Sequence, residues 1–468
     1  MSEDLWRRGA GELAQLIAAR EVSSREVVQA HLDRIEAVNP HLNAVVLVLA
    51  DEALAAADAA DAASAGGPLH GVPFTVKENI DVAGTPTTSG VPALAEAVSP
   101  IDAPQVERLR AAGAIPIART NLPDLGLRIH TDSSLRGLTR NPWDPDVTAG
   151  GSSGGEASAL ASGMSPLGLG NDVGGSLRNP AHCCGIASIK PTPGRVPHAT
   201  VIPPEDMGPG MQFMAVEGVM ARRVGDVRLG LSIVCGMSPR DPESVPVPLD
   251  VPRPESRRVA LLAEPPGGDT HPEIAAAVRR AGDALADAGY EVVEAEPPAY
   301  EQVLDVWGRF LFNDIRAQEE ILRAVMGPDA IRFLDHIGVL YDDLDAAGVV
   351  ATLVERRALG RAWNAFLETH PLILSPIWSQ PPFPHGWDAA SPENSKATME
   401  LMRPVMPANL LGLPAAAVNA GKAAGLPAGV QVMGARFQDL ACLEAAEAIE
   451  TRLGVAEAID PVLATART

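Results

Sequence analysis

Four side chains in this sequence stand in settings that could support nucleophilic chemistry. Lys77 lies in the largely apolar segment GVPFTVKENIDVAG, and a lysine held away from water loses its proton near neutral pH and can act as a base. Ser152 and Ser153 lie in the run GGSSGGEASAL, and Ser176 follows DVGG. Glycines directly before a serine let successive backbone N–H groups converge on one point, as an oxyanion hole requires. Together these residue types supply a base, a proton relay and a nucleophile.

Ser152 and Ser153 also each match the G-x-S-x-G pattern of the nucleophile elbow in α/β-hydrolases. An elbow needs a later acid and then a histidine to take the serine proton. Histidines do follow, but none lies in a recognisable catalytic segment: His182, His198, His271, His336, His370 and His385. Because glycine is so dense here, chance matches arise easily, and a flexible turn explains the stretch as well. Likewise, Lys77 could lie at a sheet edge with its amine in water, and Ser176 could be an ordinary turn serine.

No cofactor motif stands out in the sequence. The run GLGNDVGG gives G-x-G-x-x-x-G, one residue longer than the dinucleotide fingerprint, and Asn179-Pro180 interrupts any helix that would follow. Four cysteines are scattered along the chain: Cys183, Cys184, Cys235 and Cys442. They have neither the number expected of a disulfide framework nor the spacing of a metal site. We therefore expect no nucleotide, metal or organic cofactor.

The composition is that of a globular protein with an acidic surface. The 468 residues are 46% hydrophobic and 21% charged, and the formal net charge is −22. Because an acidic surface repels phosphate groups, nucleic acid and anionic membranes are poor partners. No stretch approaches the roughly 18 apolar residues of a membrane-spanning helix, and the N-terminal MSEDLWRRGA lacks the apolar core of a signal peptide. We expect a cytoplasmic protein with a small-molecule substrate, and a homodimer is left open.

Local patterns predict the elements that would position these side chains. Residues 1–65 are expected to be helical, with a capping box formed by Ser23 and Glu26 and an alanine-rich helix in 51–65. The segment GVPFTVK alternates as a strand does, and residues 103–113 are typical of a helix that leads into the strand AIPIA. The helix-then-strand order recurs in ALADAGYEVVEAE, which favours an α/β architecture.

Two regions differ from the rest in composition. Residues 140–198 are dense in Gly, Ser, Pro and Asn, and short apolar runs between them favour a buried site built from close backbone turns over a linker. For residues 299–400 we expect helices plus the proline-rich loop SPIWSQPPFPHGW, forming a variable, substrate-facing region. Seven aromatic residues lie there: Trp307, Phe310, Phe312, Phe333, Trp378, Phe383 and Trp387. They either pack the core or line an apolar funnel over Ser176.

The run GGSSGGEASALASGMSPLGLGNDVGGSLRNPAHCCGIASIKPTPGRV resembles the signature of the amidase signature family of serine hydrolases. Three further segments resemble other parts of that family: GVPFTVKENIDVAGTPTTSG its lysine segment, TNLPDLGLRIHTDSSLRGLTRNPWD its connector, and GLPAGVQVMGARFQDLACLEAA its C-terminal strand and helix. The resemblance covers most of residues 5–235 and 400–455. Residues 299–400 lack a recognisable family pattern.

The resemblance implies a Ser–cis-Ser–Lys triad at Ser176, Ser152 and Lys77. Ser176 resembles the nucleophile that forms the acyl-enzyme, and Lys77 resembles the base. Ser152, which would follow a cis Gly151–Ser152 peptide, resembles the proton relay. The spacing of 24 residues between the two serines is that of the family. Ser153 resembles the family's second serine, which hydrogen-bonds the lysine.

Further site positions follow from the same resemblance. The backbone N–H groups of four consecutive residues fall on the oxyanion-hole positions: Val173, Gly174, Gly175 and Ser176. Asp172 and Arg178 are expected to bind substrate or to support the site, as are Gly151 and Ser153. Arg178 matches an arginine whose role varies in the family, from contact with a substrate carboxylate to structural support.

The implied fold is one large α/β domain over residues 1–468, with a mixed, twisted central sheet covered by helices. Its expected parts are N-terminal helices at 1–65, a signature core at 70–235, the variable region at 299–400, and a C-terminal strand and helix at 400–455 that belong to the core.

The implied reaction is hydrolysis of a carboxylic amide through a covalent acyl-enzyme, and aryl amides, esters and carbamates suit the same machinery. One alternative is the glutamine-hydrolysing amidotransferase subunit of the same family, which works in a complex. That subunit usually has a tyrosine-glycine segment after KPTPGRV, where this chain continues PHATVIPPEDMGPGMQF. The other alternative is a catalytically inactive binding or scaffold protein on this fold. This alternative is disfavoured by the presence of Lys77, Ser152 and Ser176.

Overall fold

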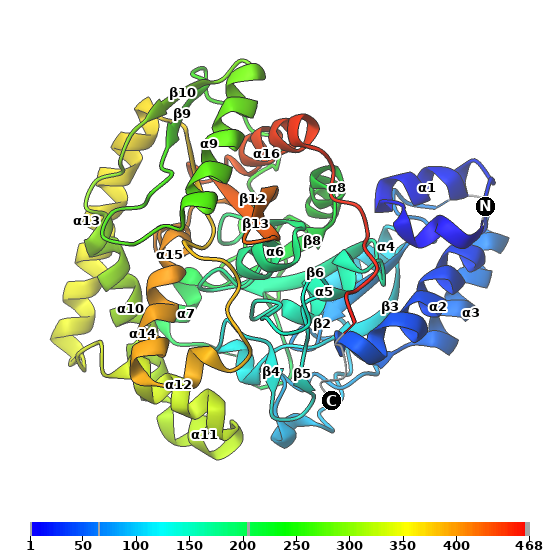
Figure 1. Ribbon diagram of the computed structural model, residues 1–468. Coiled ribbons are helices and arrows are strands. Elements are labelled where there is room, and N and C mark those ends of the chain that lie inside the picture. Colours follow the sequence, from blue (N-terminus) through cyan, green and yellow to red (C-terminus); the bar gives the residue numbers. More distant parts are fainter. Residues whose placement is uncertain (1, 64–65, 204–205, 464–468) are drawn as a thin grey trace.

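An 11-stranded mixed sheet runs through the computed structural model, which describes residues 2–63, 66–203 and 206–463 (Figure 1). From one edge to the other the strands are β1 (Val45–Val48), β3 (Ile115–Thr120), β2 (Pro73–Lys77), β6 (Leu167–Asp172), β8 (Val216–Ala221), β7 (Ala187–Lys190), β12 (Ala415–Ala423), β13 (Leu426–Gly434), β11 (Leu372–Pro376), β9 (Arg258–Leu261) and β10 (Glu291–Glu294). A separate small sheet joins β4 (Asp132–Ser133) to β5 (Gly137–Leu138).

Two hydrophobic cores lie on opposite faces of the large sheet. On β12, Ala416 and Val418 belong to one core and the alternating Ala415 and Ala417 to the other, as the two-residue period of a strand requires. The first core includes helices α1 (Ala10–Ala18), α4 (Pro104–Ala111), α8 (Val224–Val234), α9 (Pro272–Asp287) and α16 (Asp439–Leu453). The second includes α5 (Gly154–Ala161), α6 (Arg178–Cys184), α7 (Pro209–Met214), α10 (Tyr300–Ala317), α11 (Glu319–Val325), α12 (Pro328–Gly338), α13 (Ala346–Thr369), α14 (Pro392–Leu401) and α15 (Met406–Leu410). The expected α/β domain with a helix-covered mixed sheet is confirmed.

A third, smaller core joins α2 (Ser24–Leu42) and α3 (Ala50–Ala62) to the β1 edge of the sheet, drawn in blue in Figure 1. α2 begins with the predicted capping box, in which the Ser23 N–H donates to Glu26 Oε2 at 2.8 Å and the Glu26 N–H donates to Ser23 Oγ at 3.1 Å. The alanine-rich helix is confirmed as α3, although residues 64–65 at its predicted end lie outside the described residues. None of the helices in the described ranges is long and apolar enough to cross a membrane.

The strand predicted at GVPFTVK is confirmed as β2, but its alternation does not mark an exposed face. Thr75 and Lys77 are as fully buried as Phe74 and Val76, because both faces of β2 are covered, one by the first core and the other by α5 and the turn before it. The helix and strand predicted around residues 103–113 are confirmed as α4 and β3. Short 3₁₀ helices complete the secondary structure: η1 (Ser2–Arg7), η2 (Pro92–Leu94), η3 (Asp124–Gly126), η4 (Trp387–Ala389) and η5 (Arg403–Val405).

Residues 299–400 contain the predicted helices, α10 to α14, but also a strand that the sequence did not reveal. β11 pairs with β13 and β9 inside the sheet, two strands from its β10 edge. Its sequence, LILSP, is a short apolar run without alternation, and such a run cannot be told from a buried helix segment by its period. The predicted proline-rich loop, residues 375–387, is a loop only between β11, which takes Ser375 and Pro376, and η4, which begins at Trp387.

Candidate active site

Lys77 and Ser152 meet although 75 residues separate them in the chain. Lys77 is the last residue of β2, and Ser152 lies in the glycine-rich turn that leads into α5. The Lys77 amine donates to Ser152 Oγ at 2.7 Å and to Asn171 Oδ1, near the end of the neighbouring strand β6, at 2.6 Å. Both the lysine and the serine are buried. The two parallel strands therefore hold the amine against the serine hydroxyl.

The glycines of the turn are required by close packing. The Gly151–Ser152 peptide is cis, as the resemblance implied. A Cβ at Gly151 would lie 2.6 Å from the Ile129 carbonyl carbon, and a Cβ at Gly155 would lie 2.5 Å from the Asn121 backbone. A side chain at either position would push the turn away from the loop that it packs against. The density of glycine is therefore explained by close backbone approach in a buried site, as predicted, and not by a linker.

Ser176 faces the same cavity as Ser152. It lies between β6 and α6, and its carbonyl accepts a hydrogen bond from the Ser153 N–H at 3.3 Å, which ties the two serine-bearing segments together. Ser176 is 4% exposed, so its hydroxyl is reachable only through the cavity. The three residues predicted as a triad are thus brought to one place.

The prediction that Ser153 hydrogen-bonds the lysine is wrong. Ser153 Oγ is buried and has no hydrogen-bond partner among the described residues. The side chain packs against β6, where a Cβ at Gly170 would come within 2.8 Å of Ser153 Oγ. Asn171 supplies the second acceptor for Lys77 instead. The sequence signal for Asn171 was its place in the polar pair that ends the apolar strand LGLGND.

Burial sets the protonation state of Lys77. Removal of the amine from water lowers the pKa of Lys77 to about 7, although the negative charges of Glu217 and Asp172 raise it in part. A substantial fraction of the amine is therefore neutral at neutral pH. A neutral amine that donates to Asn171 keeps a lone pair that can take the proton of Ser152.

Of the backbone donors expected in the oxyanion hole, one is already engaged. The Gly175 N–H donates to Asp172 Oδ1 at 2.7 Å, so it points away from a substrate oxygen. Gly175 has φ +92°, and a Cβ there would lie 2.3 Å from Asn179 Oδ1. Asn179 Nδ2 in turn donates to the carbonyls of Gly174 at 3.0 Å and Gly151 at 3.3 Å. Asn179 thus holds the two serine-bearing turns together, a role that the sequence did not reveal.

The cavity beside these serines has a volume of about 370 Å³ and mostly aliphatic walls. Of the two alternatives for the seven aromatic residues of 299–400, the funnel is wrong, since none of the seven lines this cavity. They lie in or against the second core, where Trp378 stacks on Phe383 with ring centroids 5.5 Å apart. From that region only α10, α11 and the residue between them contribute, through Asp314, Ile315, Gln318, Ile321, Leu322 and Val325. The other walls include residues of 87–94, 125–127, 198–203 and 206–217.

A family model described as Amidase matches residues 26–443. The chain belongs to the amidase signature family. This amidase is therefore an amidohydrolase, an enzyme that acts on amide C–N bonds. It is 42% identical over 458 residues to an indoleacetamide hydrolase of Bradyrhizobium diazoefficiens, which covers 96% of this chain and 87% of that protein.

More distant relatives share the fold and the length of the amidase. A 6-aminohexanoate-cyclic-dimer hydrolase of Paenarthrobacter ureafaciens is 31% identical over 484 residues, which covers 96% of this chain and 95% of that protein. The solved structure of 6-aminohexanoate cyclic dimer hydrolase complexed with substrate matches with a TM-score of 0.85 at 29% identity, over 98% of this chain and 99% of that one.

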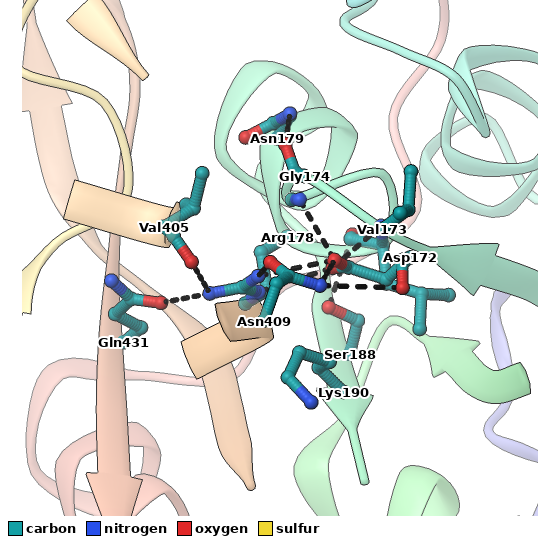
Figure 2. A network of polar contacts seen from close by, with 12 residues as sticks. Asp172, Val173, Gly174, Arg178, Asn179, Ser188, Lys190, Val405, Asn409 and Gln431 are labelled. Atoms are coloured by element: carbon teal, nitrogen blue, oxygen red, sulfur yellow. Dashed lines mark hydrogen bonds and ion pairs between the residues drawn. The ribbon is translucent and has the colours of Figure 1, made fainter. Parts of the chain in front are cut away.

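A buried ion pair supports the active-site turn of the amidase (Figure 2). Arg178 Nε donates to Asp172 Oδ2 at 3.1 Å, and its other nitrogens donate to Asn409 Oδ1, Gln431 Oε1 and the Val405 carbonyl at 2.6 to 2.9 Å. Burial alone would raise the pKa of Asp172, but the Arg178 charge and hydrogen bonds outweigh it and lower the pKa to about 2. Because its donors are used inside the fold, Arg178 supports the turn and does not reach the cavity.

Replacing Arg178 with methionine is expected to lower the free energy of unfolding by about 3–5 kcal/mol, because it leaves the Asp172 carboxylate buried without a counter-charge. Urea unfolding of the wild type and the variant measures this loss. The double variant Arg178→Met/Asp172→Asn should recover part of it, since no uncompensated charge remains. A double variant less stable than the sum of the two single changes would contradict the ion-pair explanation.

Proposed function

We propose that this amidase hydrolyses a small carboxylic amide through an acyl-enzyme on Ser176, with Ser152 as proton relay and Lys77 as base. The observation that carries the proposal is the hydrogen bond of 2.7 Å from the buried Lys77 amine to Ser152, beside the cavity that Ser152 and Ser176 both line. The pKa of about 7 of Lys77 supports the role of a base.

The proposed reaction moves one proton along the triad in each direction. Neutral Lys77 takes the proton of Ser152, which takes that of Ser176, and Ser176 Oγ attacks the amide carbon. The oxyanion forms beside the N–H groups of Val173, Gly174 and Ser176. When the C–N bond breaks, the proton returns through Ser152 to the leaving amine. Water then attacks the acyl ester through the same relay and releases the acid.

The cavity favours an apolar amide over glutamine. Glutamine carries an α-carboxylate, and the described residues that line the cavity include no lysine or arginine to pair with it. Valine, leucine, isoleucine and methionine side chains provide much of the apolar surface of the walls, and such a surface suits an apolar acyl group. Since a relative at 42% identity is an indoleacetamide hydrolase, we propose arylacetamides as the substrate class.

His198 and Glu217, the latter at the start of β8, form a polar pair on the cavity wall. His198 Nδ1 lies 2.8 Å from Glu217 Oε1, while Glu217 Oε2 is buried and has no hydrogen-bond partner among the described residues. Burial lowers the pKa of His198, but its hydrogen bond and charge interaction with Glu217 raise it above the ordinary value overall. We propose that an N–H group on the acyl part of the substrate supplies the donor that this carboxylate lacks. An indole ring carries such a donor.

A comparison of indoleacetamide, naphthylacetamide, acetamide and glutamine tests both parts of this proposal. The two aryl amides are expected to have the higher kcat/KM, and glutamine hydrolysis as the preferred reaction would favour the amidotransferase alternative. Glu217→Gln should lower kcat/KM roughly 10- to 100-fold for indoleacetamide, which loses an acceptor for its ring N–H. Naphthylacetamide has nearly the same shape without that donor and should change little at alkaline pH. Equal losses in kcat/KM for the two aryl amides would show that Glu217 does not bind the indole N–H group.

A further inference from the structure

A second hollow, separate from the active-site cavity, lies along α13 and gathers four arginines. This groove, of about 640 Å³, is lined by Phe213, Val350, Leu353, Val354, Arg356, Arg357, Gly360, Arg361, Asn364, Leu411 and Arg436. Its α13 residues recur at intervals of three and four, so they form one stripe of the helix. We call it the arginine groove.

The arginine groove holds positive charge that no carboxylate neutralises. Among the described residues, no Asp or Glu pairs with Arg356, Arg357, Arg361 or Arg436. On the neighbouring helix α10, by contrast, Arg309 is paired with two carboxylates. The whole chain has a net charge of −22, with 59 acidic and 37 basic side chains. Four guanidinium groups without a carboxylate partner therefore make this hollow positive on a molecule that is acidic overall.

Two of these arginines contact aromatic rings of the fold, and one of them also donates a hydrogen bond to the backbone. Arg356 Nε donates to the Leu410 carbonyl at 2.7 Å, and its guanidinium lies 4.6 Å from the centroid of the Phe213 ring. Burial, and then the nearby charge of Arg436, lower the pKa of Arg356 to about 10. Arg436 in turn lies with its guanidinium 5.6 Å from the centroid of the Phe437 ring. Since like charges repel across this hollow, an anion placed between them would relieve the repulsion and form charge-assisted hydrogen bonds.

The groove is also apolar, which restricts the kind of anion that fits it. Val350 and Val354 are 60% and 66% exposed on the α13 stripe, and Phe213 is 36% exposed. An inorganic anion would leave these side chains in water. A molecule that joins an anionic head to an apolar chain or ring would cover them and meet the guanidinium groups together.

We propose that the arginine groove binds an amphipathic anion, a carboxylate or phosphate joined to an apolar chain or ring. The short helix α7 links this site to the cavity. Phe213 lines the groove, whereas Met211 on the same helix lines the active-site cavity and its N–H donates to Asp314 Oδ2 at 2.8 Å. A ligand that covers Phe213 therefore contacts the element that forms one wall of the cavity, and KM for an arylacetamide is expected to change when the groove is filled.

Isothermal titration calorimetry with decanoate, decyl phosphate and uncharged decyl maltoside, below their micelle concentrations, tests the proposal. The wild type should bind one or both anions and not the uncharged amphiphile, with affinity that falls as salt rises. Decanoate and decyl phosphate distinguish a carboxylate from a phosphate head. Arg357→Glu/Arg361→Glu, which changes two exposed side chains, should weaken binding at least about tenfold and remove the effect of the anion on KM.

The matched control is Arg279→Glu/Arg452→Glu, which makes the same change in net charge at two exposed arginines outside the groove. It should bind as the wild type does. The proposal is overturned if the groove variant keeps full affinity, since the anion then binds elsewhere, or if decyl maltoside binds as tightly as the anions. It is also overturned if the wild type is a dimer that the groove variant dissociates, because a second copy then covers the groove.

Discussion

Replacing Ser176 with alanine is expected to abolish turnover of every amide substrate, with a loss in kcat of roughly 10⁴- to 10⁶-fold, because the proposed nucleophile then has no oxygen to form the acyl bond. Ser176 lines the cavity and follows the Gly174–Gly175 turn. The change removes one oxygen from a side chain, so the fold should survive. Steady-state kinetics on naphthylacetamide, with matched circular dichroism and unfolding curves, measures the effect.

The two neighbouring serines provide matched controls for Ser176. Ser152→Ala should leave a weak activity, since loss of a proton relay costs roughly 10²- to 10⁴-fold. Ser153→Ala should change activity little, because Ser153 Oγ has no hydrogen-bond partner among the described residues. After treatment with a fluorophosphonate, mass spectrometry should place the adduct on the peptide that contains Ser176. An adduct on Ser152 or Ser153 would restore the nucleophile-elbow hypothesis.

The sequence predicted which residues would meet in the candidate site, but not how their hydrogen bonds are shared. Lys77, Ser152 and Ser176 stand in segments whose residue types and spacing are specific, so their positions could be carried over from a resemblance. Asn171 and Asn179 were missed because an asparagine near the end of a strand or at a helix start is common. Ser153 Oγ packs against Gly170 of β6 and does not meet the lysine, and a sequence pattern does not encode that contact.

The elements with strong local signals were predicted correctly, and those that depend on long-range packing were not. The Ser23 capping box and the α4–β3 pair follow from neighbouring residues alone. β11 is a strand because β9 and β13 flank it, and its own residues would also suit a helix. The aromatic residues of 299–400 were ambiguous for a related reason, since a ring buries equally well in a core or in a cavity wall. The structure places Trp378 in the core, hydrogen-bonded to Asn179 at 2.9 Å.

Lys77 is the second residue whose replacement should strongly lower activity. If Lys77 must be neutral to take the proton of Ser152, kcat/KM should fall as the pH drops below its pKa of about 7 and should level off on the alkaline side. Lys77→Met should lose roughly 10²- to 10⁴-fold at every pH, because neither serine is then deprotonated. Lys77→Arg should also be inactive, since a guanidinium stays protonated throughout this range. A pH profile of kcat/KM for naphthylacetamide measures all three proteins.

His198 is the competing explanation for such a profile, because it lines the same cavity and its pKa is raised by Glu217. His198→Gln separates the two: the acid limb should persist in this variant if Lys77 titrates, and should vanish if His198 does. Glu217→Gln predicts the direction of a shift. Since the Glu217 charge raises the pKa of Lys77, its removal should move the acid limb of the pH profile to lower pH.

The stability of the Lys77→Met variant supplies the last control. An unfolded lysine keeps its proton to about pH 10, whereas folded Lys77 releases it near 7. The buried amine therefore destabilises the fold at neutral pH, and Lys77→Met should unfold at no lower urea concentration than the wild type while being inactive.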